Sequence, residues 1–148
     1  MYKHILIATD GSQLAQKGVD HGLALAGALN ARVTFVAVSE LLTASLLTDD
    51  PDVGIFTATA DLRAASDAAA KRIVEAAGAR AKAAKVAFEI EPRSAAVAAE
   101  GILETAEERA CDLIVLASHG RRGVERLLLG SQAAEVVTRA RVPVLVVK

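Results

Sequence analysis

The chain has 148 residues and a formal net charge of −1, so no strong basic field favours nucleic acid or an anionic membrane as a partner. Hydrophobic residues make up 53% of the chain, which is typical of a folded globular protein, and Cys111 alone can form neither an intrachain disulfide nor a cysteine cluster for a metal. The sequence has no signal-peptide pattern and no apolar stretch of about 18 residues, so we expect a single cytoplasmic domain over residues 1–148.

In chain order, the first half alternates between short apolar runs and helical patterns. His4–Thr9 is an apolar run that predicts a strand buried on both faces. Small and apolar residues recur at helical spacing over residues 15–26 and predict a helix that Asn30 ends. Arg32–Val38 is β-branched and apolar and predicts a second buried strand. Residues 39–59 have no clean period and predict a long loop.

Helices and strands continue to alternate in the second half of the chain. We expect an alanine-rich helix, an edge strand, a helix, a buried strand, a helix and a final strand, at about Ala60–Ala83, Val86–Glu91, 99–106, Asp112–Ala117, 133–140 and Val142–Val147. Pro92 is expected to end the edge strand, because proline cannot donate a ladder hydrogen bond. The alternation predicts an α/β fold, a single-domain, open, doubly wound, Rossmann-like sheet of five parallel strands with helices on both faces.

Unusual residues gather after the first and fourth predicted strands. The first strand ends at Asp10-Gly11-Ser12, and the fourth runs into the segment ASHGRRG at residues 117–123. Ligands of open doubly wound sheets bind beyond the carboxyl ends of the strands, where the strand order reverses, so we expect these two loops to face each other across one crevice. Gly120 and Gly123 are expected to allow positive φ and a close approach of the backbone to a ligand.

A helix N-terminus completes this predicted site. Gly130-Ser131 opens the last predicted helix, with Ser131 as its expected N-cap, and the free N–H groups of a helix start suit an anion. Arg121 and Arg122 can add positive charge. The Asp10 carboxylate only accepts hydrogen bonds and therefore suits a ribose hydroxyl better than a phosphate. Together these features predict a nucleotide site.

Simpler roles remain open for the same residues. The glycines are typical turn residues, Ser131 can serve only as a cap, and the arginines can be solvated surface charges. His119 can be a turn residue with a structural hydrogen bond, and Asp10 can cap the first helix. Cys111 is expected in or near the core, and both histidines outside this loop are expected to be structural.

Four segments carry a recognisable pattern, HILIATDGS, RVTFVAVSE, CDLIVLASHGRRGVERLLLGS and AAEVVTRARVPVLVVK. With these segments the chain resembles the universal stress protein family over nearly its full length. ATP-binding members carry Gly-x-x-Gly, nine residues, then Gly-Ser or Gly-Thr, and this chain has Ala117-x-x-Gly120, nine residues, then Gly130-Ser131. The resemblance implies the strand order 3-2-1-4-5, with ATP, bound with or without Mg²⁺, at the reversal between strands one and four.

The resemblance also implies individual roles. Asp10 is expected near the ribose, and the backbone of Val38 is expected to meet adenine. The expected nucleotide-binding residues are Thr9, Asp10, Val38, Ala117, Ser118, His119, Gly120, Arg121, Gly130, Ser131 and Gln132. The implied function is an ATP-binding stress-response regulator that signals through nucleotide occupancy to an unidentified protein partner. No catalytic role is expected beyond slow ATP hydrolysis at most.

The last predicted strand bears on assembly. Val142–Val147 is apolar on both faces and is expected at the edge of the sheet, where an unprotected apolar strand invites pairing with another chain. The resemblance implies a homodimer joined through this strand, and an isologous two-fold contact is the usual closed solution.

Ala117 departs from the motif, which has glycine at its first position. A positive φ at this residue would cost alanine about 1–2 kcal/mol. Because Ala117 continues directly from an apolar strand, we expect a negative φ and a change in local volume only. The alternative function is a protein-interaction module of the same fold that binds no nucleotide. An adenylate-handling enzyme has little support, because the chain has neither a P-loop nor a dinucleotide-binding fingerprint.

Overall fold

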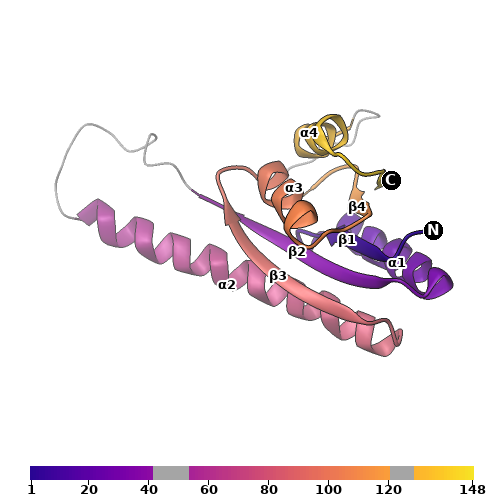
Figure 1. The fold of residues 1–148 in the computed structure, drawn as a ribbon. Helices are drawn as coiled ribbons and strands as arrows, with labels where there is room; N and C mark the ends of the chain where they lie inside the picture. The colour runs from indigo at the N-terminus through magenta and orange to yellow at the C-terminus, as the bar shows by residue number, and fades with distance from the viewer. Residues whose placement is uncertain (42–53, 121–128) are drawn as a thin grey trace.

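The computed structural model describes residues 1–41, 54–120 and 129–148 (Figure 1). Its elements in chain order are β1 (His4–Ala8), α1 (Gln13–Leu29), β2 (Arg32–Glu40), α2 (Gly54–Ala83), β3 (Phe88–Ala95), α3 (Ala98–Glu108), β4 (Leu113–Ala117), α4 (Ser131–Arg139) and β5 (Val144–Val147). This order is the alternation of strands and helices that the sequence predicts.

The five strands form one parallel sheet in the order β3-β2-β1-β4-β5. α1 and α2 cover one face of the sheet, and α3 and α4 cover the other (Figure 1). The order reverses at β1, which pairs with β2 on one side and with β4 on the other. The predicted fold class and strand order are therefore confirmed.

β1 illustrates why an unbroken apolar run suits this sheet. All five of its residues are buried, and Ile5 and Ile7 pack with α1 and α2, whereas Leu6 and Ala8 pack with α3 and α4. Successive side chains of a strand point to opposite faces, so a strand covered by helices on both faces needs apolar residues at every position. Full burial of one leucine or isoleucine side chain contributes about 1.5–3 kcal/mol.

α1 lies close to the sheet because small residues line its inner face. A Cβ added to Gly22 would lie 2.4 Å from Ile7 Cδ1, so the absence of a side chain permits this contact. The helix begins after Ser12, whose Oγ accepts a hydrogen bond from the Ala15 N–H at 3.2 Å. It ends at Asn30, which has the left-handed conformation with φ 50°, as the sequence predicts.

β3 is longer than predicted, and the expectation that Pro92 ends it is wrong. The strand passes through Pro92 and ends at Ala95. The Ala95 carbonyl of β3 accepts a hydrogen bond from the Leu41 N–H, so the backbone groups of Ala95 face β2. Successive residues of a parallel strand face alternate sides, and Pro92 lies three residues before Ala95, so its nitrogen faces away from β2. Among the strands that the structure describes, β3 has no neighbour on that side, so a proline at this position removes no ladder hydrogen bond.

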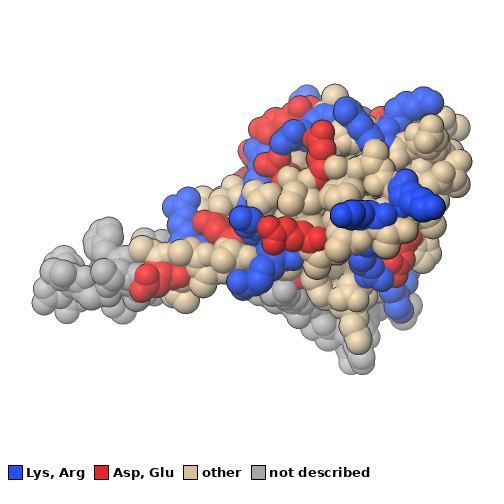
Figure 2. Space-filling model, turned by 90° about the horizontal axis from the view of Figure 1, so that it is seen from below, with Lys and Arg blue, Asp and Glu red and all other residues tan. Residues whose placement is uncertain are grey.

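The loop predicted over residues 39–59 is shorter than expected at both ends. β2 continues to Glu40, and α2 begins at Gly54 rather than near Ala60. Residues 42–53 lie outside the described residues. The first described side chains of α2, at positions 60–65, are all exposed, and this part of the helix extends beyond the sheet (Figures 1 and 2).

β5 comprises Val144–Val147, two residues fewer than predicted. Basic and acidic side chains are interspersed on the face that Figure 2 shows, in keeping with the nearly neutral net charge. Among the helices that the structure describes, none is both long and apolar enough to cross a membrane.

Candidate functional site

The loops after β1 and β4 face each other, as the sequence predicts. A Cβ added to Gly120 would lie 2.7 Å from Asp10 Oδ2, so these loops are in contact at the carboxyl edge of the sheet. β1 and β4 are the neighbours at which the strand order reverses. This contact therefore lies where open doubly wound sheets bind their ligands.

Side chains fix the shape of the loop after β1. Thr9 donates its N–H to the Val36 carbonyl at 2.9 Å, and its Oγ1 accepts from the Gly11 N–H at 3.2 Å. Asp10 Oδ1 accepts from the Ser12 N–H at 2.9 Å, and Gly11 between them has a φ of 78°. Ser12, and not Asp10, is the N-cap of α1, so the alternative role of Asp10 as the helix cap is wrong.

Ser118 organises the loop after β4. It is buried, its N–H donates to the Val147 carbonyl at 2.8 Å, and its carbonyl accepts from the Gly130 N–H at 2.8 Å. Its hydroxyl lies 3.1 Å from His119 Nδ1. These bonds hold the end of β5 and the start of α4 against the end of β4.

Gly120 allows the backbone after β4 to approach the Asp10 side chain closely, and it does not have an unusual dihedral angle. Its φ is not positive, contrary to the expectation, and the nearby Asp10 carboxylate is what excludes a side chain. Gly123 lies outside the described residues, and so do Arg121 and Arg122.

Ala117 is a strand residue, which confirms the expectation of a negative φ. It is the last residue of β4 and pairs with Val147. Leu113 and Val115 pack with α1 and α2, and side chains alternate along a strand, so the Ala117 methyl points to the same face. The replacement of the motif glycine therefore adds volume on the α1 side of β4 without backbone strain.

α4 begins one residue earlier than expected. Gly130 is the N-cap and makes no side-chain hydrogen bond, so the expectation that Ser131 is the cap is wrong. Ser131 is the first helical residue and is exposed, and its hydroxyl makes no hydrogen bond with another described residue. The first turn of α4 contains no acidic residue, so no carboxylate of this turn competes with an anion for its N–H groups.

Gln132 contacts α3. Its Oε1 accepts a hydrogen bond from the Ala99 N–H at 2.8 Å. Val97, the N-cap of α3, has no side chain that can make such a bond, so Gln132 caps this helix from α4.

The backbone of Val38 points to the crevice. In a parallel strand, the N–H and C=O of one residue face the same neighbour, and successive residues alternate between the two sides. Val36 accepts the Thr9 N–H on the β1 side, so Val38 directs both of its groups to that side as well. β1 has already ended there, and no other described residue makes a backbone hydrogen bond with Val38 on that side.

Sequence reasoning missed a polar cluster beside Val38. Asp67 Oδ1 accepts hydrogen bonds from the hydroxyls of Ser39 and Ser94, the second at 2.8 Å. These bonds keep the pKa of Asp67 below its ordinary value, with the Ser39 bond as the larger cause and the Ser94 bond second. The sequence carries no signal for this cluster, because its three members come from β2, α2 and β3.

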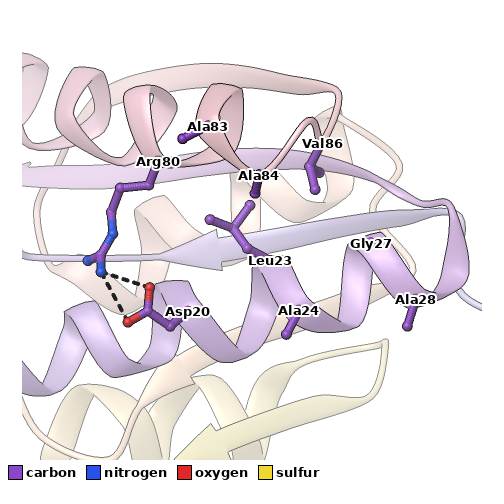
Figure 3. A pocket seen from close by; sticks show the side chains of 9 residues that line it. All are labelled: Asp20, Leu23, Ala24, Gly27, Ala28, Arg80, Ala83, Ala84 and Val86. Carbon is purple, nitrogen blue, oxygen red and sulfur yellow. Dashed lines mark hydrogen bonds and ion pairs between the residues drawn. The ribbon is translucent and has the colours of Figure 1, made fainter.

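A described groove lies away from this edge. It has a volume of about 570 Å³ and runs between α1 and α2 near the start of β3, and the Asp20–Arg80 ion pair at 2.8 Å borders it (Figure 3). It lies at the amino ends of the strands, where a doubly wound sheet does not bind its ligand. Within residues 1–41, 54–120 and 129–148, no three histidine, cysteine or carboxylate side chains gather to hold a metal ion.

Two residues expected to be structural are buried at the amino end of the sheet. His4 Nε2 lies 2.8 Å from Thr34 Oγ1, and burial, with Arg32 as a smaller cause, lowers the pKa of His4. Cys111 is also buried, and burial raises the pKa of its thiol to about 11. A thiol with so high a pKa is a poor nucleophile at neutral pH. The burial of both side chains agrees with the structural roles that the sequence predicts for them.

The fold and the crevice together define an open, doubly wound α/β protein whose candidate site lies at the β1–β4 reversal. The chain belongs to the universal stress protein family, because the model of that family matches residues 1–148. Universal stress protein MJ0531 of Methanocaldococcus jannaschii is 33% identical over 152 residues, which span 100% of this chain and 83% of that protein.

Solved structures share the whole fold. The structure of protein MJ0577 of Methanocaldococcus jannaschii has a TM-score of 0.84 and 25% identity, covering 100% of this chain and 96% of that one. A universal stress protein solved in complex with cAMP has a TM-score of 0.71 and 25% identity, covering 99% of this chain and 97% of that one.

Proposed function

We propose that the chain binds ATP in the crevice between the loops after β1 and β4 and acts as a stress-response regulator through nucleotide occupancy. The observation that carries this proposal is the direction of the Val38 backbone, which offers one N–H donor and one C=O acceptor where β1 has ended. Adenine presents an acceptor at N1 beside a donor at its 6-amino group, and guanine presents these two positions with reversed polarity. A related protein solved with cAMP supports an adenine nucleotide as the ligand.

The rest of the nucleotide would follow the crevice toward α4. Asp10, which lies against Gly120, would accept a hydrogen bond from a ribose hydroxyl. The phosphates would meet the first turn of α4, whose N–H groups and Ser131 hydroxyl can donate to them. In this proposal Mg²⁺ is carried by the triphosphate, and Thr9, Ala117, Ser118, His119, Gly120, Arg121, Gly130 and Gln132 remain predicted neighbours of the nucleotide.

We also propose that β5 joins two copies of the chain. β3, the other edge strand, carries Pro92, and its Glu89 and Glu91 form ion pairs with Arg109, which protect an edge against pairing. β5 has the sequence VLVV and no such protection, and Leu145 on it is 37% exposed. A homodimer through β5 and an unidentified protein partner complete the proposed regulatory role, to which no catalytic residue is assigned.

The test is calorimetric titration of purified protein with ATP and with cAMP, preceded by identification of any nucleotide released on denaturation. Ser131→Ala should weaken ATP binding by about 1–3 kcal/mol, the contribution of a hydrogen bond to a charged group. It should leave the melting temperature unchanged, because Ser131 is exposed and does not cap α4. If the parent chain binds neither nucleotide at millimolar concentration, the alternative function holds, an interaction module that uses no nucleotide.

A further inference from the structure

The carboxyl ends of β2 and β3 extend beyond the rest of the sheet. β1 ends at Ala8 opposite Val36, whereas β2 continues for four residues to Glu40, still paired with β3. At about 3.3 Å per residue, this two-stranded extension is about 13 Å long. It carries Val38, whose backbone groups face the β1 side beyond the end of β1. No described strand borders the extension on that side, so its position depends on the helices that hold it.

One face of the extension is held by α3. A Cβ on Gly101 would lie 2.8 Å from Val38 Cγ2, so the helix backbone comes very near this side chain. Arg93, which is paired with Val38 in the β2–β3 register, donates to Glu104 at 2.9 Å and to Glu108 at 2.6 Å. These contacts anchor only the face on which Val38 packs.

The opposite face is held by α2 through Asp67. Ser39 and Ser94 are register partners at the end of the extension, and both hydroxyls donate to the single oxygen Oδ1 of Asp67. Ser39 is buried, and it is the residue next to Val38. Asp67 lies just after the exposed residues 60–65, so it is close to where α2 first meets the sheet.

We propose that Asp67 is a positioning residue for the base of the bound nucleotide. By holding Ser39 and Ser94 it fixes the end of the β2–β3 extension and thereby the direction of the Val38 N–H and C=O. This inference rests on the proposed function, which assigns those two backbone groups to adenine. Asp67 itself does not touch the nucleotide.

Asp67→Ala tests this role without burying an unpaired group. The Ser39 and Ser94 hydroxyls lie 3.0 Å apart, and the Arg93 carbonyl lies 3.3 Å from Ser39 Oγ, so both hydroxyls keep hydrogen-bond partners. Asp67→Asn keeps an amide oxygen as the acceptor and is the conservative variant. Arg80→Ala is the matched control, because it removes the ion pair of α2 with Asp20 at the opposite end of the sheet.

Two measurements on the full chain decide the question. Calorimetric titration should show ATP affinity about threefold to tenfold lower in Asp67→Ala, the loss expected for about one hydrogen bond. It should show nearly parental affinity in Asp67→Asn and in Arg80→Ala. Residue-resolved amide hydrogen exchange without ligand should be faster at Ser39 and Leu41 in Asp67→Ala only, because these amides pair β2 with β3.

The possible outcomes separate this inference from the proposed function. Parental ATP affinity in Asp67→Ala would overturn the positioning role and leave the ATP site intact. Equal losses of ATP affinity in Asp67→Ala and Arg80→Ala would also overturn it, since the loss of any contact of α2 would then be enough to lower the affinity. A parent chain that binds no ATP would overturn both proposals.

Discussion

Gly120→Ala is the sharpest perturbation of the candidate site. The added Cβ would lie 2.7 Å from Asp10 Oδ2, about 0.7 Å short of ordinary van der Waals contact, which begins at 3.4 Å. The backbone is not strained by alanine, because φ at Gly120 is not positive. The Asp10 carboxylate must therefore move, and it is the group that we assign to the ribose.

The expected loss is larger for binding than for folding. Movement of Asp10 weakens its part-buried hydrogen bond with the Ser12 N–H, which costs about 0.5–1.5 kcal/mol of unfolding free energy. Loss of the charge-assisted bond to a ribose hydroxyl costs about 1.5–3 kcal/mol, a decrease in ATP affinity of about tenfold to a hundredfold. Calorimetric titration measures the affinity, and chemical denaturation followed by circular dichroism measures the stability.

Gly27→Ala is the matched control. Gly27 lies in α1 and a Cβ there would meet no atom within 4 Å, so alanine should raise the unfolding free energy by about 0.5–1 kcal/mol and leave ATP affinity unchanged. Parental ATP affinity in Gly120→Ala would refute the assignment of Asp10 to the nucleotide. A stability loss of several kcal/mol would instead show that the contact between the two loops holds the fold.

Three further predictions concern the core, the altered motif and the assembly. Gly22→Ala should lower the unfolding free energy by about 1–3 kcal/mol in chemical denaturation, because its Cβ would lie 2.4 Å from the buried Ile7 Cδ1; an unchanged midpoint would mean that α1 can shift freely on the sheet. Ala117→Gly should leave ATP affinity within about tenfold of the parent in calorimetry, since the methyl points to the α1 face, and ATP binding that first arises in this variant would show that the methyl closes the site. Val146→Lys should shift sedimentation from dimer to monomer, because a charge on β5 opposes edge pairing, and a parent that sediments as a monomer at micromolar concentration would refute the dimer.

The fold was predictable because each strand and helix carries its own local pattern. β4 is apolar at every position and β1 at every position after His4, and the small residues of α1 fall on one face. The exceptions depend on tertiary position. Pro92 is compatible with β3 because its nitrogen faces the open edge, and no local pattern tells an edge strand which of its sides is unpaired.

The candidate site was predictable only in part for the same reason. Asp10 and Gly120 each follow an apolar strand, and the general rule for doubly wound sheets brings such loops together. The contact of Gln132 with α3 and the role of Asp67 gave no signal, because each side chain acts on a backbone or hydroxyl group far away in sequence, the Ala99 N–H in one case and Ser39 in the other. A polar residue on a helix has the same local sequence pattern whether its side chain faces solvent or makes a hydrogen bond with a distant helix or strand.

The motif positions differ in their tolerance of a side chain, and this explains how Ala117 fits a site built for glycines. A Cβ at Gly120 would meet the Asp10 carboxylate, and one at Gly130 would lie 3.0 Å from the Ser118 carbonyl, so both positions face the crevice or its supports. Ala117 instead points to the α1 face of the sheet, as Leu113 and Val115 do. The backbone there is not crowded, because a Cβ added to Gly18 of α1 would lie 3.6 Å from the Ala117 nitrogen, an ordinary van der Waals distance. Alanine at position 117 should therefore be compatible with a nucleotide in the crevice.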